Sequence, residues 1–301
     1  MKVALTAGDN RSENIRNALE LIQEDIDLTG KSDVFIKVNF VDTEIQAAAT
    51  HVDAVRPLLE FIRARYDGRL SIGESTMMCP VQDAFEHYGY MDLLRQYDVN
   101  IVDMKEGNWE ILHLYDSNLR PMDIHYSREM LRSDYLISIG PPKTHDSATV
   151  TASIKNIVMG GVSHKHDEKT RIHQGPQVMS LDLYLMAKEH VPELAVLDGF
   201  VAMEGNGPVE GDPVDWKITI ASCDAVAADI FAADLMGFDL SKVGHLWYLQ
   251  KMGYGEGDIR KMEIVGENPD NHRRKFKPHP WYDWQIKWKD ERVAKLLGIE
   301  Y

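Results

Sequence analysis

A stretch in the middle of the chain gathers side chains that can bind anions or metal ions. It contains, in order, Lys143, Thr144, His145, Lys155, Asn156, His164, His166 and His173. The stretch follows an apolar run at residues 135–140 that reads as a buried strand. Ammonium groups attract anions, and imidazoles are ligands for transition metals. The sequence therefore predicts a binding site here for an anion, a metal ion, or both.

The start of this stretch favours an anion. Lys143 and Thr144 precede a helix expected over residues 149–159, which carries Lys155 and Asn156. Free N–H groups at a helix N-terminus favour an anion, so these side chains are expected to hold phosphate or carboxylate oxygens. The glycine-rich GK[ST] pattern of phosphate-binding loops is missing, which argues against a standard nucleotide triphosphatase.

The three later histidines are candidate ligands for a divalent transition metal. His164, His166 and His173 share one basic loop, and an H-x-H spacing is usable by metals that accept imidazole. Contact with an anion, or simple solvation, are the alternatives. The HExxH motif does not occur, which argues against a common zinc peptidase.

Two earlier strands also end in polar side chains. Lys37 and Asn39 lie in an apolar run at 34–41 and are expected on one side of that strand. A buried lysine is costly without a partner, so Lys37 either pairs with a carboxylate such as Glu74 or belongs to a site. In open α/β sheets, ligands bind beyond the carboxyl ends of strands, where Lys37, Glu74 and residues 143–145 are all expected.

A tight turn at residues 203–208, Met-Glu-Gly-Asn-Gly-Pro, follows a later strand. Glu204 is a candidate general base or metal ligand, and Asn206 a candidate anion contact, with a structural turn as the alternative. His51 and Asp224 are expected mainly to cap the helices that follow them.

The hydrophobic pattern predicts an α/β fold. Strands are expected at residues 3–6, 34–41, 70–73, 100–103, 135–140, 194–199 and 216–221, and helices near 15–22, 55–62, 149–159 and 223–236. Residues 109–115 and 122–126 form an expected antiparallel hairpin insertion. The alternation predicts a mostly parallel sheet covered by helices on both faces.

The chain from residue 268 onward differs in composition. It carries prolines, a basic run at 272–275, and Trp281, Trp284 and Trp288. The sequence predicts one domain over residues 1–267 and an aromatic C-terminal tail over 268–301. The tail is expected to wrap the domain or to form the interface of a homodimer.

Composition excludes several classes of protein. The formal net charge of -15 over 301 residues argues against a nucleic-acid binder. Two cysteines, Cys79 and Cys223, cannot ligate a four-iron cluster, which takes four thiolates. No apolar run is long enough to span a membrane, and the N-terminus does not read as a secretory signal, so a cytoplasmic location is expected.

These motifs resemble an uncharacterised family, domain of unknown function 362. The resemblance is carried by residues 36–40, the Ala-Ala-Thr-His ending at His51, Pro142-Lys143-Thr144-His145, Ile154-Lys155-Asn156, and the blocks at 198–208 and 222–237. Many members carry an attached ferredoxin-like domain with two four-iron clusters. Because this chain cannot ligate one, the resemblance implies a separate partner or a bound cofactor for any redox role. A looser similarity is to nickel-pincer lactate racemases, in the arrangement of His145, Lys155 and the later histidines.

Three interpretations follow. The first is an enzyme for a small anionic substrate or cofactor, with or without a metal, in which Lys37, Lys143 and Lys155 hold the anion. His145, Lys155 and Glu204 are then the candidate catalytic residues, and the reaction class stays open between proton transfer, redox chemistry and hydrolysis. The second is a cofactor-binding or electron-transfer accessory that works with a separate iron-sulfur partner. The third is a binding or assembly protein.

Overall fold

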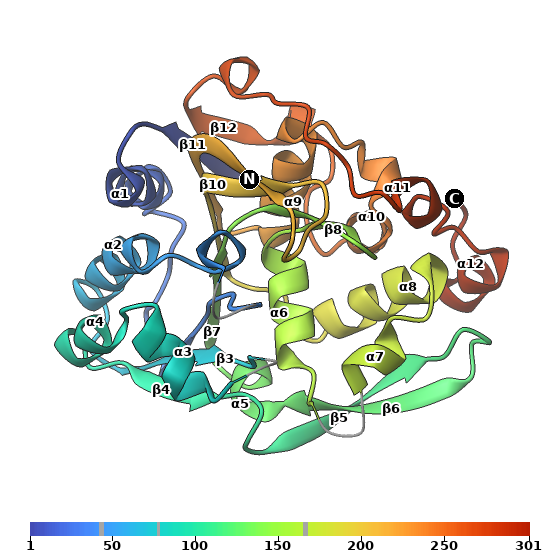
Figure 1. The fold of residues 1–301 in the computed structure, drawn as a ribbon, viewed down its shortest axis with the longest axis horizontal. Coiled ribbons are helices and arrows are strands. Elements are labelled where there is room, and N and C mark those ends of the chain that lie inside the picture. The colour runs from blue at the N-terminus through green and yellow to red at the C-terminus, as the bar shows by residue number, and fades with distance from the viewer. Residues whose placement is uncertain (42–44, 77–78, 165–167) are drawn as a thin grey trace.

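The computed structural model describes residues 1–41, 45–76, 79–164 and 168–301. Its main sheet runs in the order β12-β1-β11-β10-β7-β2-β3-β4 (Figure 1). These strands are β12 (Glu263–Gly266), β1 (Lys2–Ala7), β11 (Asp212–Ser222), β10 (Leu194–Glu204), β7 (Tyr135–Gly140), β2 (Asp33–Lys37), β3 (Arg69–Glu74) and β4 (Asn100–Asp103). Only β11 runs antiparallel to its described neighbours β1 and β10, so the predicted mostly parallel sheet is confirmed.

Helices cover both faces of this sheet, as predicted (Figure 1). One face carries α1 (Arg11–Leu21), α2 (Val52–Arg63), α3 (Val81–His87) and α4 (Met91–Gln96). The other carries α6 (Ser153–Gly161), α8 (Pro176–Ala187), α9 (Ala225–Leu235) and α10 (Gly244–Lys251). Alternation along the strands divides the core, because Val34 and Ile36 pack with the first group while Phe35 packs with the second.

The predicted hairpin is confirmed. Strands β5 (Trp109–Tyr115) and β6 (Pro121–Ser127) pair antiparallel in a separate sheet, followed by the short helix α5 (Arg128–Leu131). The hairpin packs against α8, and the amide of Tyr115 donates to the carboxylate of Asp182 on that helix.

Two predicted boundaries near the site are wrong. Strand β2 ends at Lys37, so Asn39 lies beyond the strand rather than within it. The expected helix over 149–159 begins only at Ser153, because Thr149–Thr151 form strand β9, which pairs antiparallel with β8 (Lys143–His145). Threonine and valine favour a strand, and the pairing of β9 with β8 outweighs the i, i+4 spacing of Thr149 and Ser153, which is typical of a helix.

The segment from residue 268 to the C-terminus packs along the second face. It contains the short helices α11 (Tyr282–Gln285) and α12 (Glu291–Leu297). Trp288 is buried, with its ring centroid 5.3 Å from that of Trp247 and 5.2 Å from that of Tyr248 on α10. Trp281 is 59% exposed. The domain boundary at 268 and the homodimer stay predictions.

Candidate functional site

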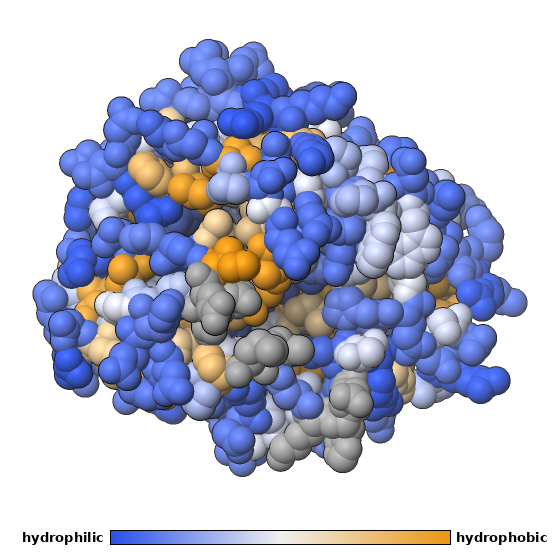
Figure 2. Space-filling model, in the orientation of Figure 1, coloured by the Kyte–Doolittle hydropathy of each residue, from blue (hydrophilic) through white to orange (hydrophobic). Residues whose placement is uncertain are grey.

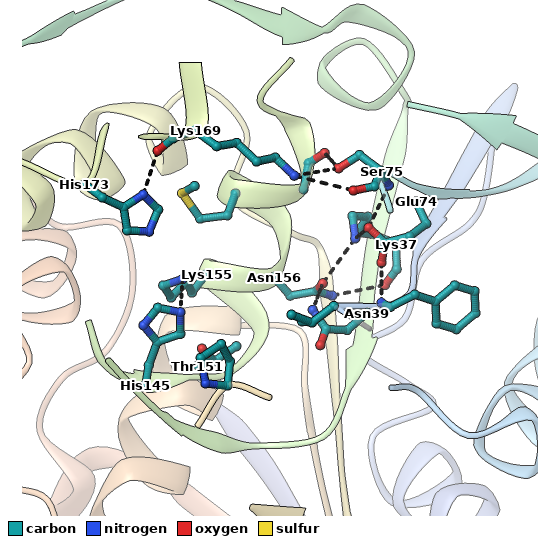
Figure 3. Close-up of a pocket in the computed structure, with 15 residues that line it drawn as sticks. Lys37, Asn39, Glu74, Ser75, His145, Thr151, Lys155, Asn156, Lys169 and His173 are labelled. Carbon is teal, nitrogen blue, oxygen red and sulfur yellow. Dashed lines mark hydrogen bonds and ion pairs between the residues drawn. The ribbon is translucent and has the colours of Figure 1, made fainter. Parts of the chain in front are cut away.

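A pocket of about 170 Å³ opens beyond the carboxyl ends of β2 and β3, beside α6 and α7 (Glu168–Ile172) (Figure 3). Its lining residues come from both halves of the chain: Lys37, Asn39, Phe40, Val41, Glu74, Ser75, His145, Thr151, Lys155, Asn156, Met159, Gly160, Lys169, His173 and Pro208. The predicted convergence of Lys37, Glu74 and His145 at strand ends is therefore present. Figure 2 shows the molecule from the side seen in Figure 1. On this face, hydrophobic surface gathers toward the centre and hydrophilic surface surrounds it.

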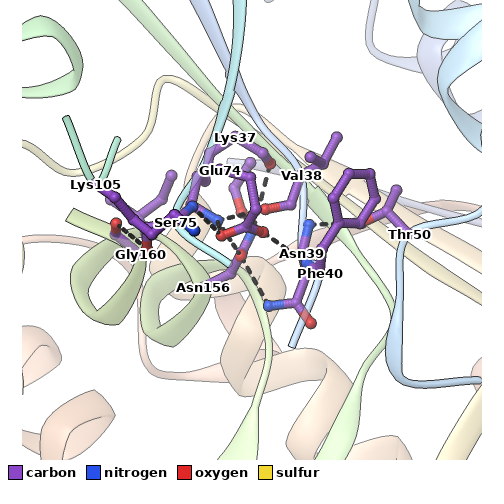
Figure 4. A network of polar contacts seen from close by, with 12 residues as sticks. Lys37, Val38, Asn39, Phe40, Thr50, Glu74, Ser75, Lys105, Asn156 and Gly160 are labelled. Carbon is purple, nitrogen blue, oxygen red and sulfur yellow. Dashed lines mark hydrogen bonds and ion pairs between the residues drawn. The ribbon is translucent and has the colours of Figure 1, made fainter. Parts of the chain in front are cut away.

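One side of the pocket is a closed polar network, which we call the ion-paired wall: Lys37, Asn39, Glu74 and Asn156 (Figure 4). The ammonium of Lys37 lies 2.8 Å from the Glu74 carboxylate, and the two side chains are almost fully buried. Glu74 also accepts hydrogen bonds from the backbone amides of Phe40 and Ser75. Burial lowers the pKa of Lys37, and the charge of Glu74 opposes that shift. The pairing of Lys37 with Glu74 is one of the two alternatives that the sequence left open.

Asn156 joins this network from α6. Its side-chain oxygen accepts from Lys37 at 3.3 Å and from Asn39 at 3.0 Å, and its amide group donates to the Ser138 hydroxyl at 3.1 Å. The helix thereby ties the ends of β2 and β7 together.

The network extends behind the pocket to Lys143, which is fully buried. Its ammonium donates to the side-chain oxygen of Asn39 at 2.6 Å and to the carbonyl of Ala48 at 2.9 Å. Burial, and then the charge of Lys155, lower the pKa of Lys143 to about 7. Lys143 is not among the residues that line the pocket. It can therefore act on a ligand there only through its charge and through its hydrogen bond to Asn39.

Gly160 explains how Lys37 fits beneath α6. A Cβ atom at residue 160 would lie 2.0 Å from Cε of Lys37, well inside any real contact distance. The carbonyl of the same glycine accepts from the Ser75 hydroxyl at 2.9 Å. Only glycine lets the helix backbone approach the lysine this closely.

We call His145, Lys155 and Lys169 the lysine wall. His145 and Lys155 lie across the pocket from the ion-paired wall, and the ammonium of Lys169 reaches over to Ser75, next to Glu74 (Figure 3). The ammonium nitrogen of Lys155 lies 2.8 Å from Nε2 of His145, and Nδ1 of His145 lies 2.8 Å from the Asp146 carboxylate. Burial lowers the pKa of Lys155 to about 8, against the charge of Asp146. Burial and then the charge of Lys155 lower the pKa of His145 to about 3, so the imidazole is neutral at neutral pH.

Lys169 reaches the pocket from α7. Its ammonium donates to the Ser75 hydroxyl at 3.0 Å, and burial lowers its pKa to about 7. Among the residues that the structure describes, neither Lys155 nor Lys169 forms an ion pair with a carboxylate. The lysine wall therefore presents two amino groups that no described carboxylate contacts directly, although Asp146 and Glu74 lie near enough for their charges to act on them.

The N-terminus of α6 is occupied by a carboxylate of the protein itself. The first amides of α6, those of Ser153 and Ile154, both donate at 2.8 Å to the carboxylate of Asp229 on α9. Asp229 is almost fully buried, and burial raises its pKa to about 7. Because the protein supplies its own carboxylate there, these two amides are not free for an external anion, and the anion contacts expected at this helix stay predictions.

Thr144 is also placed differently from the prediction. Its hydroxyl is buried and donates to the carbonyl of Gly205 at 3.0 Å, so it neither caps a helix nor reaches the pocket as described. The hydrogen bond instead joins β8 to the turn after β10. The anion-binding role of Thr144 stays a prediction that this contact does not support.

In the turn after β10, Glu204 and Asn206 are not among the residues that line the pocket. Glu204 accepts from the backbone amide of Lys277 at 3.0 Å, and the Asn206 side chain donates to Glu210 at 3.0 Å. The roles predicted for Glu204 and Asn206 stay predictions. Of the same turn, Pro208 lines the pocket.

The predicted metal ligands are only partly described. Nε2 of His164 lies 3.1 Å from the carbonyl of Ser75, and Nδ1 of His173 lies 2.6 Å from the carbonyl of Lys169. His166 lies outside the described residues. Within the described ranges, no group of three or more histidine, cysteine or acidic side chains is arranged to hold a metal ion. The metal site stays a prediction.

Lys169 and Thr151 line the pocket without having been predicted as site residues. Lys169 was only one of the lysines in the basic loop, for which contact with an anion was an alternative, and Thr151 was part of an expected helix. Lys169 lies on α7, and no spacing in the sequence shows that this helix turns toward the pocket. The predicted capping roles are confirmed, since His51 accepts from the amide of Asp53 and Asp224 from that of Ala227.

The fold and the pocket define an α/β protein with a lysine-lined site at the strand ends. The chain belongs to the family described as domain of unknown function (DUF362), whose match covers residues 34–234. It is 28% identical over 188 residues to a thylakoid-associated protein of Synechocystis sp., a match over 62% of this chain and 57% of that protein.

A solved structure of low sequence identity shares the fold. The lactate racemase apoprotein from Thermoanaerobacterium thermosaccharolyticum superposes with a TM-score of 0.50 at 14% identity, covering 77% of this chain and 56% of that one. A Thermotoga maritima protein covers 69% of this chain and 54% of its own, with a TM-score of 0.44. The chain thus spans little more than half the length of these relatives. Within the described residues, no helix has the length and apolar character needed to cross a membrane.

Proposed function

We propose that this protein is an enzyme that binds a small anionic substrate or cofactor in the pocket between the ion-paired wall and the lysine wall. One observation supports this proposal most: Lys155 and Lys169 line one pocket of about 170 Å³ without forming ion pairs to carboxylates in the described structure. Burying charge without a partner is costly, so a site that keeps such lysines is expected to receive the compensating charge from a ligand.

The pocket also has the groups that proton transfer needs. A base or acid works best when its pKa lies near the working pH, and the pKa of Lys155 is lowered to about 8. His145 holds Lys155 in place and is in turn oriented by Asp146. Proton transfer to or from the bound anion is therefore the reaction class that we favour, with Lys155 as the group that exchanges the proton.

The anion is expected to be small and to carry a carboxylate or phosphate. Ammonium groups on the lysine wall give charge-assisted hydrogen bonds to such oxygens, which are stronger than hydrogen bonds between neutral groups. Asn39 and Asn156 of the ion-paired wall also line the pocket. We place the protein in the cytoplasm, although a relative is described as thylakoid-associated.

A thermal-shift screen tests this proposal. Phosphate, acetate, oxalate and malate would each be added at matched ionic strength, with sodium chloride as the reference. We expect at least one of them to raise the melting temperature of the wild type, because a ligand that binds only the folded state stabilises it. The gain should disappear in Lys155→Met and Lys169→Met. Equal melting temperatures in all the salts would contradict the proposal.

A further inference from the structure

We propose that Lys155 is a nucleophile that forms an imine with the carbonyl carbon of a small 2-oxo carboxylate. This inference rests on the proposed function, since it takes the anion pocket as given, and it names the substrate class. It differs in the role of Lys155, whose nitrogen bonds to the substrate instead of exchanging a proton with it as a free amine. It starts from the different surroundings of the buried lysines. Lys37 is held by a carboxylate, and Lys143 lies behind the pocket against Asn39 and a backbone carbonyl. Lys155 faces the pocket with a neutral imidazole as its partner.

His145 can serve both protonation states of Lys155. With the proton on Nδ1, the imidazole donates to Asp146 at 2.8 Å and its Nε2 accepts from the lysine ammonium. With the proton on Nε2, Nδ1 accepts from the backbone amide of Ser147 at 3.0 Å, and Nε2 donates to the lysine amine. Both arrangements keep the lysine nitrogen in place, 2.8 Å from the ring. His145 is thus a positioning residue for an amine that must lose and regain protons.

Burial favours a neutral amine at residue 155, because taking a lysine out of water favours its uncharged form. Lys169 lines the same pocket and donates to the Ser75 hydroxyl. A bound carboxylate favours the charged form of Lys169, which can then hold that carboxylate while Lys155 meets the carbonyl. The two lysines therefore match the two functional groups of a 2-oxo carboxylate.

The covalent step needs no oxidant or reductant. The Nζ lone pair of neutral Lys155 attacks the carbonyl carbon, and the C=O π pair moves to the oxygen, which takes a proton. The nitrogen loses a proton, the hydroxyl leaves as water after protonation, and the nitrogen lone pair forms the C=N bond. One amine and one carbonyl give one imine and one water. A protonated imine then draws electrons from the neighbouring carbon, which is the chemistry that proton removal there requires.

The pocket has room for a small substrate. Its volume of about 170 Å³ suits a few non-hydrogen atoms, as in glyoxylate or pyruvate. Met159 and Pro208 supply apolar surface next to the lysines for a short side group.

Reductive trapping tests the inference. The whole chain would be incubated with glyoxylate and sodium cyanoborohydride, and the product analysed by intact mass and peptide mapping. We expect a single reduced adduct on Lys155 in the wild type. Lys155→Arg should lose it, while Lys295→Arg, a change at an exposed lysine on α12, should keep it. Labelling should rise with pH through about 8, where burial has lowered the pKa of Lys155 and the amine becomes free.

Two outcomes would overturn the inference: an adduct on Lys169, or labelling spread evenly over surface lysines. Peptide mapping of the wild type decides between them even if Lys155→Arg fails to fold. Oxalate, which has carboxylates and no ketone or aldehyde, separates this inference from the proposed function. Stabilisation by oxalate with no trapped adduct would refute the imine and leave the anion pocket standing. Absence of both would refute both. In His145→Gln, a shifted pH profile of labelling is expected from a positioning residue, and an unchanged profile would contradict that role.

Discussion

The two walls of the pocket differ in the partners of their buried lysines. On the ion-paired wall, Lys37 meets Glu74, and its carboxylate is further held by backbone amides. On the lysine wall, Lys155 and Lys169 meet only neutral partners among the described residues. The comparison separates lysines that hold the fold together from lysines that are available to a ligand.

The largest effect is expected when the ion-paired wall is broken. Glu74→Gln leaves Lys37 buried without its carboxylate, and removing one partner of a buried ion pair costs about 3–5 kcal/mol. Denaturant unfolding measures the loss of the free energy of unfolding. Glu110→Gln is the matched control, because its partner Arg132 lies at the surface, and we expect a much smaller change. Equal losses of the free energy of unfolding in the two variants would contradict the special role of the buried pair Lys37–Glu74.

A second effect tests how α6 and Lys37 fit together. In Gly160→Ala the added methyl group would lie 2.0 Å from Cε of Lys37, and overpacking of this kind costs about 1–3 kcal/mol. The same change favours the helix by up to about 1 kcal/mol, which opposes the loss. A net decrease in the free energy of unfolding is expected. A net increase would show that Lys37 moves away without cost.

A substitution in the lysine wall should change stability in the opposite direction to a substitution in the ion-paired wall. Lys155→Met removes a buried cation that has no carboxylate partner, so the anion-free protein should keep or gain stability. Its affinity for a small anion should fall about tenfold or more, as expected for the loss of a charge-assisted hydrogen bond. Unfolding and calorimetric titration measure the two quantities. If Lys155→Met were strongly destabilised, Lys155 would be a lysine that stabilises the fold, as Lys37 is.

The smallest effect is a pH dependence in which stability and binding diverge. Burial lowers the pKa of Lys155 to about 8 and that of Lys169 to about 7, whereas an unfolded lysine keeps its ordinary higher value. Between pH 7 and about 10 the unfolded chain therefore binds more protons, so the stability contributed by these lysines rises with pH. Anion affinity should fall over the same range as the ammonium charge is lost. Parallel trends would contradict these shifts, and Lys155→Met should flatten both.

Sequence patterns predicted the sheet and the general place of the site. Strands β1, β3, β4 and β7 lie where the hydrophobic pattern predicted them, and the carboxyl ends of β2, β3 and β8 bring Lys37, Glu74 and His145 together as expected. These predictions succeed because periodicity and the position of ligands in open α/β sheets depend on local pattern and topology.

The rest depends on contacts between distant residues. No residue near Ser153 in the sequence indicates that Asp229, on another helix, occupies the N-terminus of α6. The β8–β9 pairing that displaced the start of the expected helix is likewise a tertiary choice. Lys169 joins the pocket only because α7 folds back toward Ser75, which no spacing in the sequence shows.

The most direct test of the lysine wall is calorimetric titration of oxalate into the wild type and into the Lys155→Met/Lys169→Met double variant. The account predicts measurable binding to the wild type and about 100-fold weaker binding to the double variant, if each lysine contributes about 1.4 kcal/mol. The double variant should unfold at least as far into denaturant as the wild type. Equal affinity in both proteins would contradict the claim that these two lysines form the anion site.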